Sequence, residues 1–320
     1  MRAGELLAHP RELPSRVRDA VSRRVTEQIR ERLPLLTPGL MRFGLYWPHE
    51  PDSESYSRPV PYEPAGAGGA STSLPIPPRK FWADYCTSPE SFLASGQEDC
   101  EVMRRLLRES GFPIESAERI LELGCAGGRM LRWLIDLVPH TQLWGTDIWS
   151  SAILWCQDYL NPPCHFATNT MVPHLPFEDR SFDLVYCGSI FTHLDDLAAA
   201  WFLELHRILR PGGRLYFSLN DRHALDIFGG KGRPEDYPRY YERTGGQHVW
   251  DHFVKANMRC EDYRRFRQGE ANMVSLNRSK MTHVMWDAEV LLRHLDYGFR
   301  LCAVTPVSYG HQSTVLLERQ

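Results

Sequence analysis

The segment at residues 120–131, ILELGCAGGRML, constrains the fold more than any other part of the chain. An apolar run that contains Glu122 meets a cluster of small residues, and an apolar run compatible with a helix follows over residues 130–138. The small residues are Gly124, Ala126, Gly127 and Gly128. This order predicts a strand, a tight turn and a helix, in which bare backbone and a helix N-terminus meet a ligand. Glycine suits the turn because it adopts positive φ and permits close approach. A turn that only packs against the protein gives the same pattern.

The composition is that of an ordinary globular protein. Of the 320 residues, 42% are hydrophobic and 24% are charged, which suffices for a sizeable core in one or two domains. A net charge of −3 gives no electrostatic reason to expect a nucleic-acid partner. No apolar run approaches the roughly 20 residues that span a bilayer, and MRAGELLAHPREL at the start lacks a secretory signal. The eight cysteines form no CxxC pair, so we expect reduced thiols, no metal and a soluble cytoplasmic protein.

Residues 1–75 are expected to lie outside the main domain. Apolar residues recur every four positions over residues 11–36 and predict an amphipathic helix. We expect this helix to pack on the domain or on a second subunit, which would make a homodimer; a membrane-surface helix is the alternative. Residues 48–78 are rich in Pro, Gly, Ala and Ser and predict an extended arm. The main domain should therefore span residues 76–320.

Strand-like and helix-like runs alternate along the main domain. The strand-like runs are residues 120–123, 143–146, 182–187 and 215–219. The helix-like runs are residues 89–112, 130–137, 151–159 and 198–209. This alternation predicts an α/β fold, a mostly parallel sheet with helices on both faces. Ligands of such folds bind outside the carboxyl ends of the strands, which is where the turn after Glu122 lies.

Asp147 is the second landmark, because it ends the second strand-like run 23 residues after Gly124. An acid at about this offset binds the ribose hydroxyls of adenosine cofactors. The same residue could also cap the helix that follows. Arg129 stands where a dinucleotide fingerprint G-x-G-x-x-G requires its last glycine, which disfavours NAD(P).

Four segments resemble the successive motifs of class I S-adenosylmethionine-dependent methyltransferases. They are ELGCAGGR, TDIW, LPFEDRSFDLVYCGSIFTHL and LHRILRPGGRLYFSL, in the order and spacing of that family, over about residues 118–220. Residues 299–305 and 313–318 resemble the family's final antiparallel strands, and residues 286–295 the helix before them. The resemblance implies a doubly wound, seven-stranded, mostly parallel sheet, the Rossmann-like methyltransferase fold. Ala126 departs from the family's more frequent glycine.

The resemblance also implies roles for individual residues. Asp147 would bind the ribose, Ile148 would pack on the adenine, and Asn169 would contact the adenine amino group. The methionine end of S-adenosylmethionine would be held by Glu122 and by the backbone of Gly124, Cys125, Ala126 and Gly128. The residues beside the sulfonium would be Cys187, Gly188 and Ser189.

His193 is the first candidate for a general base or an acceptor contact. It follows the fourth strand-like run in SIFTHLDDL, and histidine is the usual base near neutral pH. A histidine that only bonds locally at the start of the next helix is the alternative. Asp195 and Asp196 are expected to cap that helix.

Residues 221–282 form an insertion that should act as a lid over the acceptor. Long connections inside compact domains are often functional, and this one is rich in aromatic and basic residues. The candidate acceptor-binding residues are Tyr240, Tyr241, His248, Trp250 and His252. Tyr309 and His311 are weaker candidates for the same pocket. We expect no metal, because His248 and His252 lack an evident third ligand.

The sequence therefore predicts a methyltransferase that uses S-adenosyl-L-methionine. The acceptor is expected to be a small molecule or a glycan, with oxygen as the expected acceptor atom; transfer to nitrogen or carbon stays open. Two further alternatives also stay open: a non-catalytic scaffold that keeps the cofactor fold, and an NAD(P)-dependent oxidoreductase.

Overall fold

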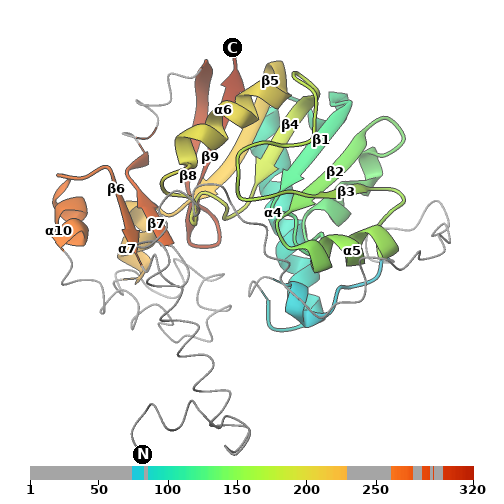
Figure 1. Cartoon of the computed structure of the whole chain (residues 1–320), viewed down its shortest axis with the longest axis horizontal. Helices are drawn as coiled ribbons and strands as arrows, with labels where there is room; N and C mark the ends of the chain where they lie inside the picture. Colours follow the sequence, from blue (N-terminus) through green and yellow to red (C-terminus); the bar gives the residue numbers. More distant parts are fainter. Residues whose placement is uncertain (1–73, 83–85, 229–260, 277–282, 289–290, 292–297) are drawn as a thin grey trace, which may run out of the picture. The chain divides into compact units, whose positions relative to one another are not determined.

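A seven-stranded sheet forms the centre of the protein (Figure 1). The computed structural model describes residues 74–82, 86–228, 261–276, 283–288, 291 and 298–320. The strands are β1 (Arg119–Leu123), β2 (Gln142–Asp147), β3 (His165–Thr168), β4 (Phe182–Cys187), β5 (Leu209–Leu219), β8 (Phe299–Tyr309) and β9 (Gln312–Arg319). Their order is β3-β2-β1-β4-β5-β9-β8; the first five are parallel, and β9 is antiparallel to both β5 and β8. The predicted doubly wound sheet and its antiparallel pair are confirmed.

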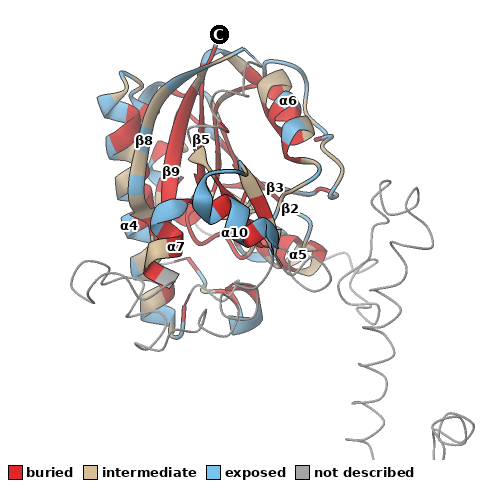
Figure 2. Ribbon diagram, turned by 90° about the vertical axis from the view of Figure 1, so that its left-hand side faces the viewer, coloured by how far each residue is buried: buried red, intermediate tan, exposed pale blue. Residues whose placement is uncertain are grey.

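Helices cover both faces of this sheet. Helices α4 (Pro89–Glu109) and α5 (Ser150–Tyr159) and the 3-10 helix η6 (Leu131–Leu137) share one apolar core with the sheet, and α6 (Ala198–Ile208) shares the other. Successive residues of β1 divide between the two cores, Ile120 with α4 and Leu121 with α6, as the alternation of side chains along a strand requires. In Figure 2, β9 is buried along nearly its whole length, whereas the edge strand β8 is only partly covered.

Both ends of α4 have recognisable capping residues. The Ser88 side chain accepts a hydrogen bond from the backbone N–H of Ser91, and the Ser91 side chain accepts one from the Ser88 N–H. This reciprocal capping box starts the helix. Gly111, with φ at 78°, lies just beyond the helix end, where a left-handed residue is common.

The helix predicted over residues 130–137 is present as a 3-10 helix over residues 131–137, and the backbone N–H of Leu131 donates to the carboxyl of Glu122. Two local predictions were wrong. Strand β5 starts at Leu209, six residues before the predicted run, and takes in the RPGG segment. Trp286, expected to start a helix, ends strand β7 (His283–Trp286) because it pairs with Met273.

A smaller layer lies within and just beyond the predicted insertion. Helices α7 (Arg222–Phe228) and α10 (Glu261–Gln268) and the antiparallel pair of β6 (Met273–Leu276) and β7 share a separate apolar cluster, which includes Leu225, Phe266 and Met285. Residues 229–260, like the predicted arm at residues 1–73, lie outside the described residues. Within the described part of the chain, no helix is both long and apolar enough to cross a bilayer.

A buried ion pair joins α4 to the turn that follows β1. Arg129 Nη1 lies 2.7 Å from Asp99 Oδ2, and both side chains are less than a tenth exposed. The Arg129 backbone also packs closely on α4, because a Cβ on Gly96 would lie 2.2 Å from the Arg129 carbonyl oxygen. The pair therefore fixes the first half of α4 against the turn.

We expect Asp99→Ala to lower the free energy of unfolding by about 3–5 kcal/mol, because it leaves a buried guanidinium without its counter-charge. Asp136→Ala, which breaks the more exposed pair with Arg104, should cost less than about 1 kcal/mol. Urea denaturation followed by circular dichroism measures both changes. Equal losses in the two variants would contradict the role given to the buried pair.

Candidate functional site

The turn after β1 is held from the end of β2. The backbone N–H groups of Gly124 and Cys125 donate to the Thr146 carbonyl at 2.7 and 3.0 Å. The N–H of Ala126 donates to Asp147 Oδ2 at 2.8 Å. These bonds place the turn at the carboxyl ends of neighbouring parallel strands, the edge where ligands bind in such sheets.

The glycines of the turn make room for protein side chains. A Cβ on Gly124 would lie 2.2 Å from Ile190 Cδ1, one on Gly127 would lie 2.7 Å from Pro77 Cγ, and one on Gly128 would lie 2.6 Å from Leu160 Cδ1. Close packing therefore explains part of the glycine pattern without any ligand. The evidence for a ligand must come from the side chains around the turn.

Ala126 adopts a backbone conformation that favours glycine. Its φ is 43°, in the left-handed region that is unfavourable for residues with a Cβ. Its hydrogen bond to Asp147 helps to offset this strain. Asp147 therefore helps to hold the turn in this shape.

Asp147 is half-buried and fixed by two backbone donors. Its Oδ1 accepts from the N–H of Trp149 at 2.8 Å, and its Oδ2 accepts from Ala126. The N-cap of α5 is Trp149, with no side-chain cap, so the alternative role of Asp147 as a helix cap is not what the structure shows. Carboxylate oxygens can each accept more than one hydrogen bond, so this arrangement is compatible with a pair of ribose hydroxyls.

Asn169 presents a buried acceptor beside Asp147. The N–H of Asn169 donates to the Asp147 carbonyl at 3.0 Å, and its Nδ2 donates to the Thr170 carbonyl at 2.8 Å. The Asn169 side chain is only 5% exposed, yet its Oδ1 has no hydrogen-bond partner within the described part of the chain. A buried unpaired acceptor is costly, and an amino group of a bound base would satisfy it.

Two large apolar side chains are exposed, one directly after Asp147 and one shortly after Asn169 in the sequence. Ile148, predicted to pack on adenine, is 48% exposed, and Met171 is 58% exposed. Large exposed apolar side chains of this kind suit the faces of a flat aromatic base. The sequence analysis missed Met171, although its place two residues after Asn169 was the available signal.

Glu122 supports the turn from inside the core. Its Oε2 accepts hydrogen bonds from the Leu131 N–H at 3.1 Å and from the Tyr186 hydroxyl at 3.0 Å. Burial raises the pKa of Glu122 to about 8, against the opposing effects of Arg129 and of these hydrogen bonds. The carboxyl is therefore mostly protonated at neutral pH and holds the start of η6.

The end of β4 meets the turn between β8 and β9. The thiol of Cys187 is buried and its pKa is raised by that burial. Gly188 faces the Tyr309 hydroxyl, which would lie 2.2 Å from a Cβ at that position. Ser189 has a φ of 60°, and its side chain accepts from Gln312 Nε2 at 2.8 Å. His311, two residues after Tyr309 in the sequence, is also buried.

His193 lies exposed on the loop after β4, beside the smaller layer. Its ring centroid is 5.3 Å from that of His283, and burial, with the neighbouring His193, lowers the pKa of His283 to about 4. His283 is therefore neutral at physiological pH. The loop is joined to β7 by the hydrogen bond from the Val284 N–H to the Thr192 carbonyl, at 2.8 Å.

The expected caps of α6 were wrong. The N-cap of α6 is Leu197, without a side-chain cap. Asp195 instead accepts a hydrogen bond from the Ser275 hydroxyl at 2.9 Å, so it ties the loop to β6. The candidates Tyr240, Tyr241, His248, Trp250 and His252 all lie outside the described residues.

We expect Glu122→Gln to flatten the pH dependence of stability. The folded protein holds a proton on Glu122 up to about pH 8, whereas the unfolded chain releases it above about pH 4.5, so wild-type stability falls as pH rises between these values. Glutamine keeps an acceptor for Leu131 but does not titrate. The stability of the wild type relative to the variant should fall by about 1 kcal/mol per pH unit in this window. Parallel slopes in urea titrations at pH 5 to 8 would contradict the assignment.

Comparison with known proteins supports a methyl-transfer site. A family described as "Methyltransferase domain" matches residues 121–217. The malonyl-[acyl-carrier protein] O-methyltransferase of Hahella chejuensis is 29% identical over 135 residues, 40% of this chain and 48% of that protein. A phthiotriol/phenolphthiotriol dimycocerosates methyltransferase of Mycobacterium ulcerans is 31% identical over 106 residues, 32% of this chain and 38% of that protein. The chain thus spans less than half the length of these relatives.

Among solved structures, an S-adenosylmethionine-dependent methyltransferase from Clostridium acetobutylicum is similar with a TM-score of 0.45 and 12% identity, over 70% of this chain and 91% of that one. The segment matched by the family contains the glycine turn, Asp147, Asn169 and the end of β4. This part of the chain is therefore similar to known methyltransferase domains.

Proposed function

We propose that this protein transfers a methyl group from S-adenosylmethionine to an oxygen of a small-molecule or glycan acceptor. The observation that carries the proposal is the buried Oδ1 of Asn169, which has no hydrogen-bond partner among the described residues. It lies beside Asp147, at the carboxyl edge of the segment that matches a methyltransferase domain. An acceptor there fits the adenine amino group, and a fixed carboxylate next to it fits a ribose.

The donor would lie along this edge. Asp147 takes the ribose, Ile148 and Met171 flank the adenine, and Asn169 accepts from the amino group. The backbone of the glycine turn and of Cys187 to Ser189 borders the methionine end. Bound S-adenosylmethionine supplies an electrophilic methyl group, and the protein's task is to align an acceptor with it.

His193 is the candidate base for an oxygen acceptor. It lies exposed on the loop after β4, and bonds to both β6 and β7 hold that loop. A base in this position takes the proton of an acceptor hydroxyl as the new bond forms. One relative, the H. chejuensis protein, is an O-methyltransferase by name, which favours oxygen over nitrogen or carbon.

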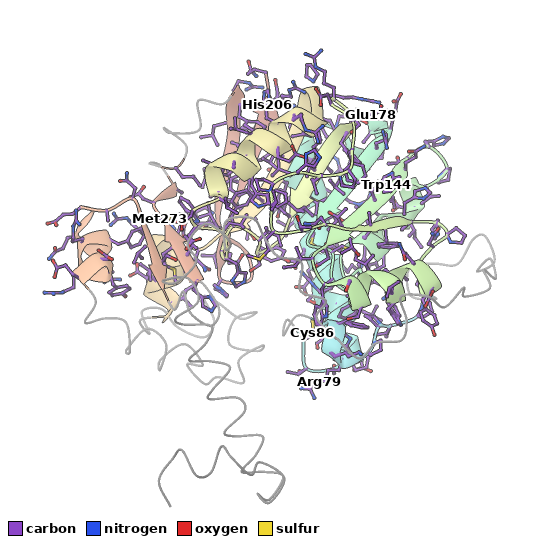
Figure 3. All side chains as sticks on the ribbon, in the orientation of Figure 1. Arg79, Cys86, Trp144, Glu178, His206 and Met273 are labelled. Carbon is purple, nitrogen blue, oxygen red and sulfur yellow. The ribbon has the colours of Figure 1, made fainter. Side chains whose placement is uncertain are left out.

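The cofactor assignment predicts a clear order of affinities. S-adenosylhomocysteine should bind the wild type, and Asn169→Leu should weaken binding by about tenfold, because the adenine amino group loses its acceptor. Asp147→Ala should weaken it further. Isothermal titration calorimetry measures these affinities. His206→Ala is a matched control, since His206 lies in the last turn of α6 and its ring packs on Phe299 at the start of β8 (Figure 3). Tight binding of NAD(P)H and none of S-adenosylhomocysteine would favour the oxidoreductase alternative.

The base assignment predicts a loss of turnover without a loss of cofactor. His193→Ala should reduce transfer from labelled S-adenosylmethionine by about 10²–10⁴-fold and leave S-adenosylhomocysteine affinity unchanged. The assay uses a panel of phenolic, carboxylic and sugar hydroxyl acceptors, and His206→Ala again serves as control. Cofactor binding without transfer to any acceptor would favour the non-catalytic scaffold.

A further inference from the structure

The turn between β8 and β9 reaches across the sheet to the end of β4. Two separate contacts show this. The Tyr309 hydroxyl fills the space that a Cβ on Gly188 would need, and Gln312 donates from Nε2 to Ser189 Oγ at 2.8 Å. Gln312 also accepts from the Ser218 hydroxyl at 2.7 Å. The C-terminal hairpin is therefore part of the edge where β4 ends.

The Tyr309 hydroxyl is clamped from the opposite side by the glycine turn. Arg129 Nη2 donates to the Tyr309 oxygen at 2.5 Å, and the guanidinium carbon lies 5.6 Å from the Tyr309 ring centroid. Arg129 is itself held by Asp99 at 2.7 Å. All three side chains are less than a tenth exposed, so the oxygen has little freedom to move.

This oxygen thus lies between two segments that the proposed function gives to the methyl donor. Arg129 belongs to the turn that borders the methionine end, and Gly188 is the first residue after β4. A phenolic oxygen is a hydrogen-bond acceptor. Oxygen atoms attract polarised C–H groups, and the methyl and methylene groups on a sulfonium are strongly polarised by its positive charge.

We propose that the Tyr309 hydroxyl contacts the sulfonium end of S-adenosylmethionine and makes the site prefer the charged donor over its neutral product, S-adenosylhomocysteine. The inference rests on the proposed function and adds a residue from the C-terminal hairpin to the donor site. Arg129 and Asp99 act through Tyr309 and are positioning residues. The alternative is a tyrosine that only packs and bonds to Arg129.

The test compares the affinities of two ligands in one variant. Tyr309→Phe keeps the ring and its packing but removes the oxygen. We expect its affinity for S-adenosylmethionine to fall about three- to tenfold more than its affinity for S-adenosylhomocysteine. A non-reactive analogue with an ammonium group in place of the methylsulfonium should follow the charged donor. Calorimetry gives all three affinities, and thermal unfolding shows that the variant is folded.

Tyr216→Phe is the matched control, because Tyr216 is a buried tyrosine of the same apolar core but lies within β5 rather than in the hairpin turn. It should leave the ratio of the two affinities unchanged. An equal loss for both ligands in Tyr309→Phe, or no loss, would overturn the proposal and leave Tyr309 with a packing role. If the wild type bound neither ligand, the proposed function itself would fail, which is a different result.

Discussion

The buried ion pair between Asp99 and Arg129 is the interaction that fixes the edge of the sheet at which β1 and β4 end. It joins three segments that are far apart in the sequence, since Arg129 also bonds to Tyr309, 180 residues away. Removing two charges from water is costly, and a buried pair seldom repays that cost in stability alone. What the pair does provide is position: α4, the glycine turn and the C-terminal hairpin can meet in only one arrangement. Under the proposed function, the alignment of a methyl group with a nucleophile needs such rigidity more than it needs additional stability.

Two carboxyl groups at this edge have opposite environments and therefore separate tasks. Glu122 is buried, mostly protonated at neutral pH, and bonded to the backbone of η6 and to Tyr186. Asp147 is half-buried and accepts from two backbone N–H groups. Protonation lets Glu122 remain in the core without an uncompensated charge. The one acid maintains the shape of the turn, and the other remains at the surface where a ribose can reach it.

Much of this edge of the sheet could be predicted from sequence because its signals are local. Strand β4 occupies the predicted residues, and Asp147 follows the glycine turn at the expected offset. The errors arise where a distant group decides the local structure. Pairing with Met273 places Trp286 in a strand. No sequence pattern near either residue predicts the contact between Tyr309 and Gly188, because the contact depends on the order of strands β4, β5, β9 and β8 in the sheet.

The loop after β4 is held by strands that lie outside the family match. The loop that carries His193 is fixed by bonds to β6 and β7, through Ser275 and Val284. These strands lie beyond residue 217, where the methyltransferase domain match ends. Under the proposed function, the residues that hold the donor lie within the family match, whereas the layer that would select the acceptor lies outside it. On that proposal, relatives matched only over the domain inform the donor far more than the acceptor.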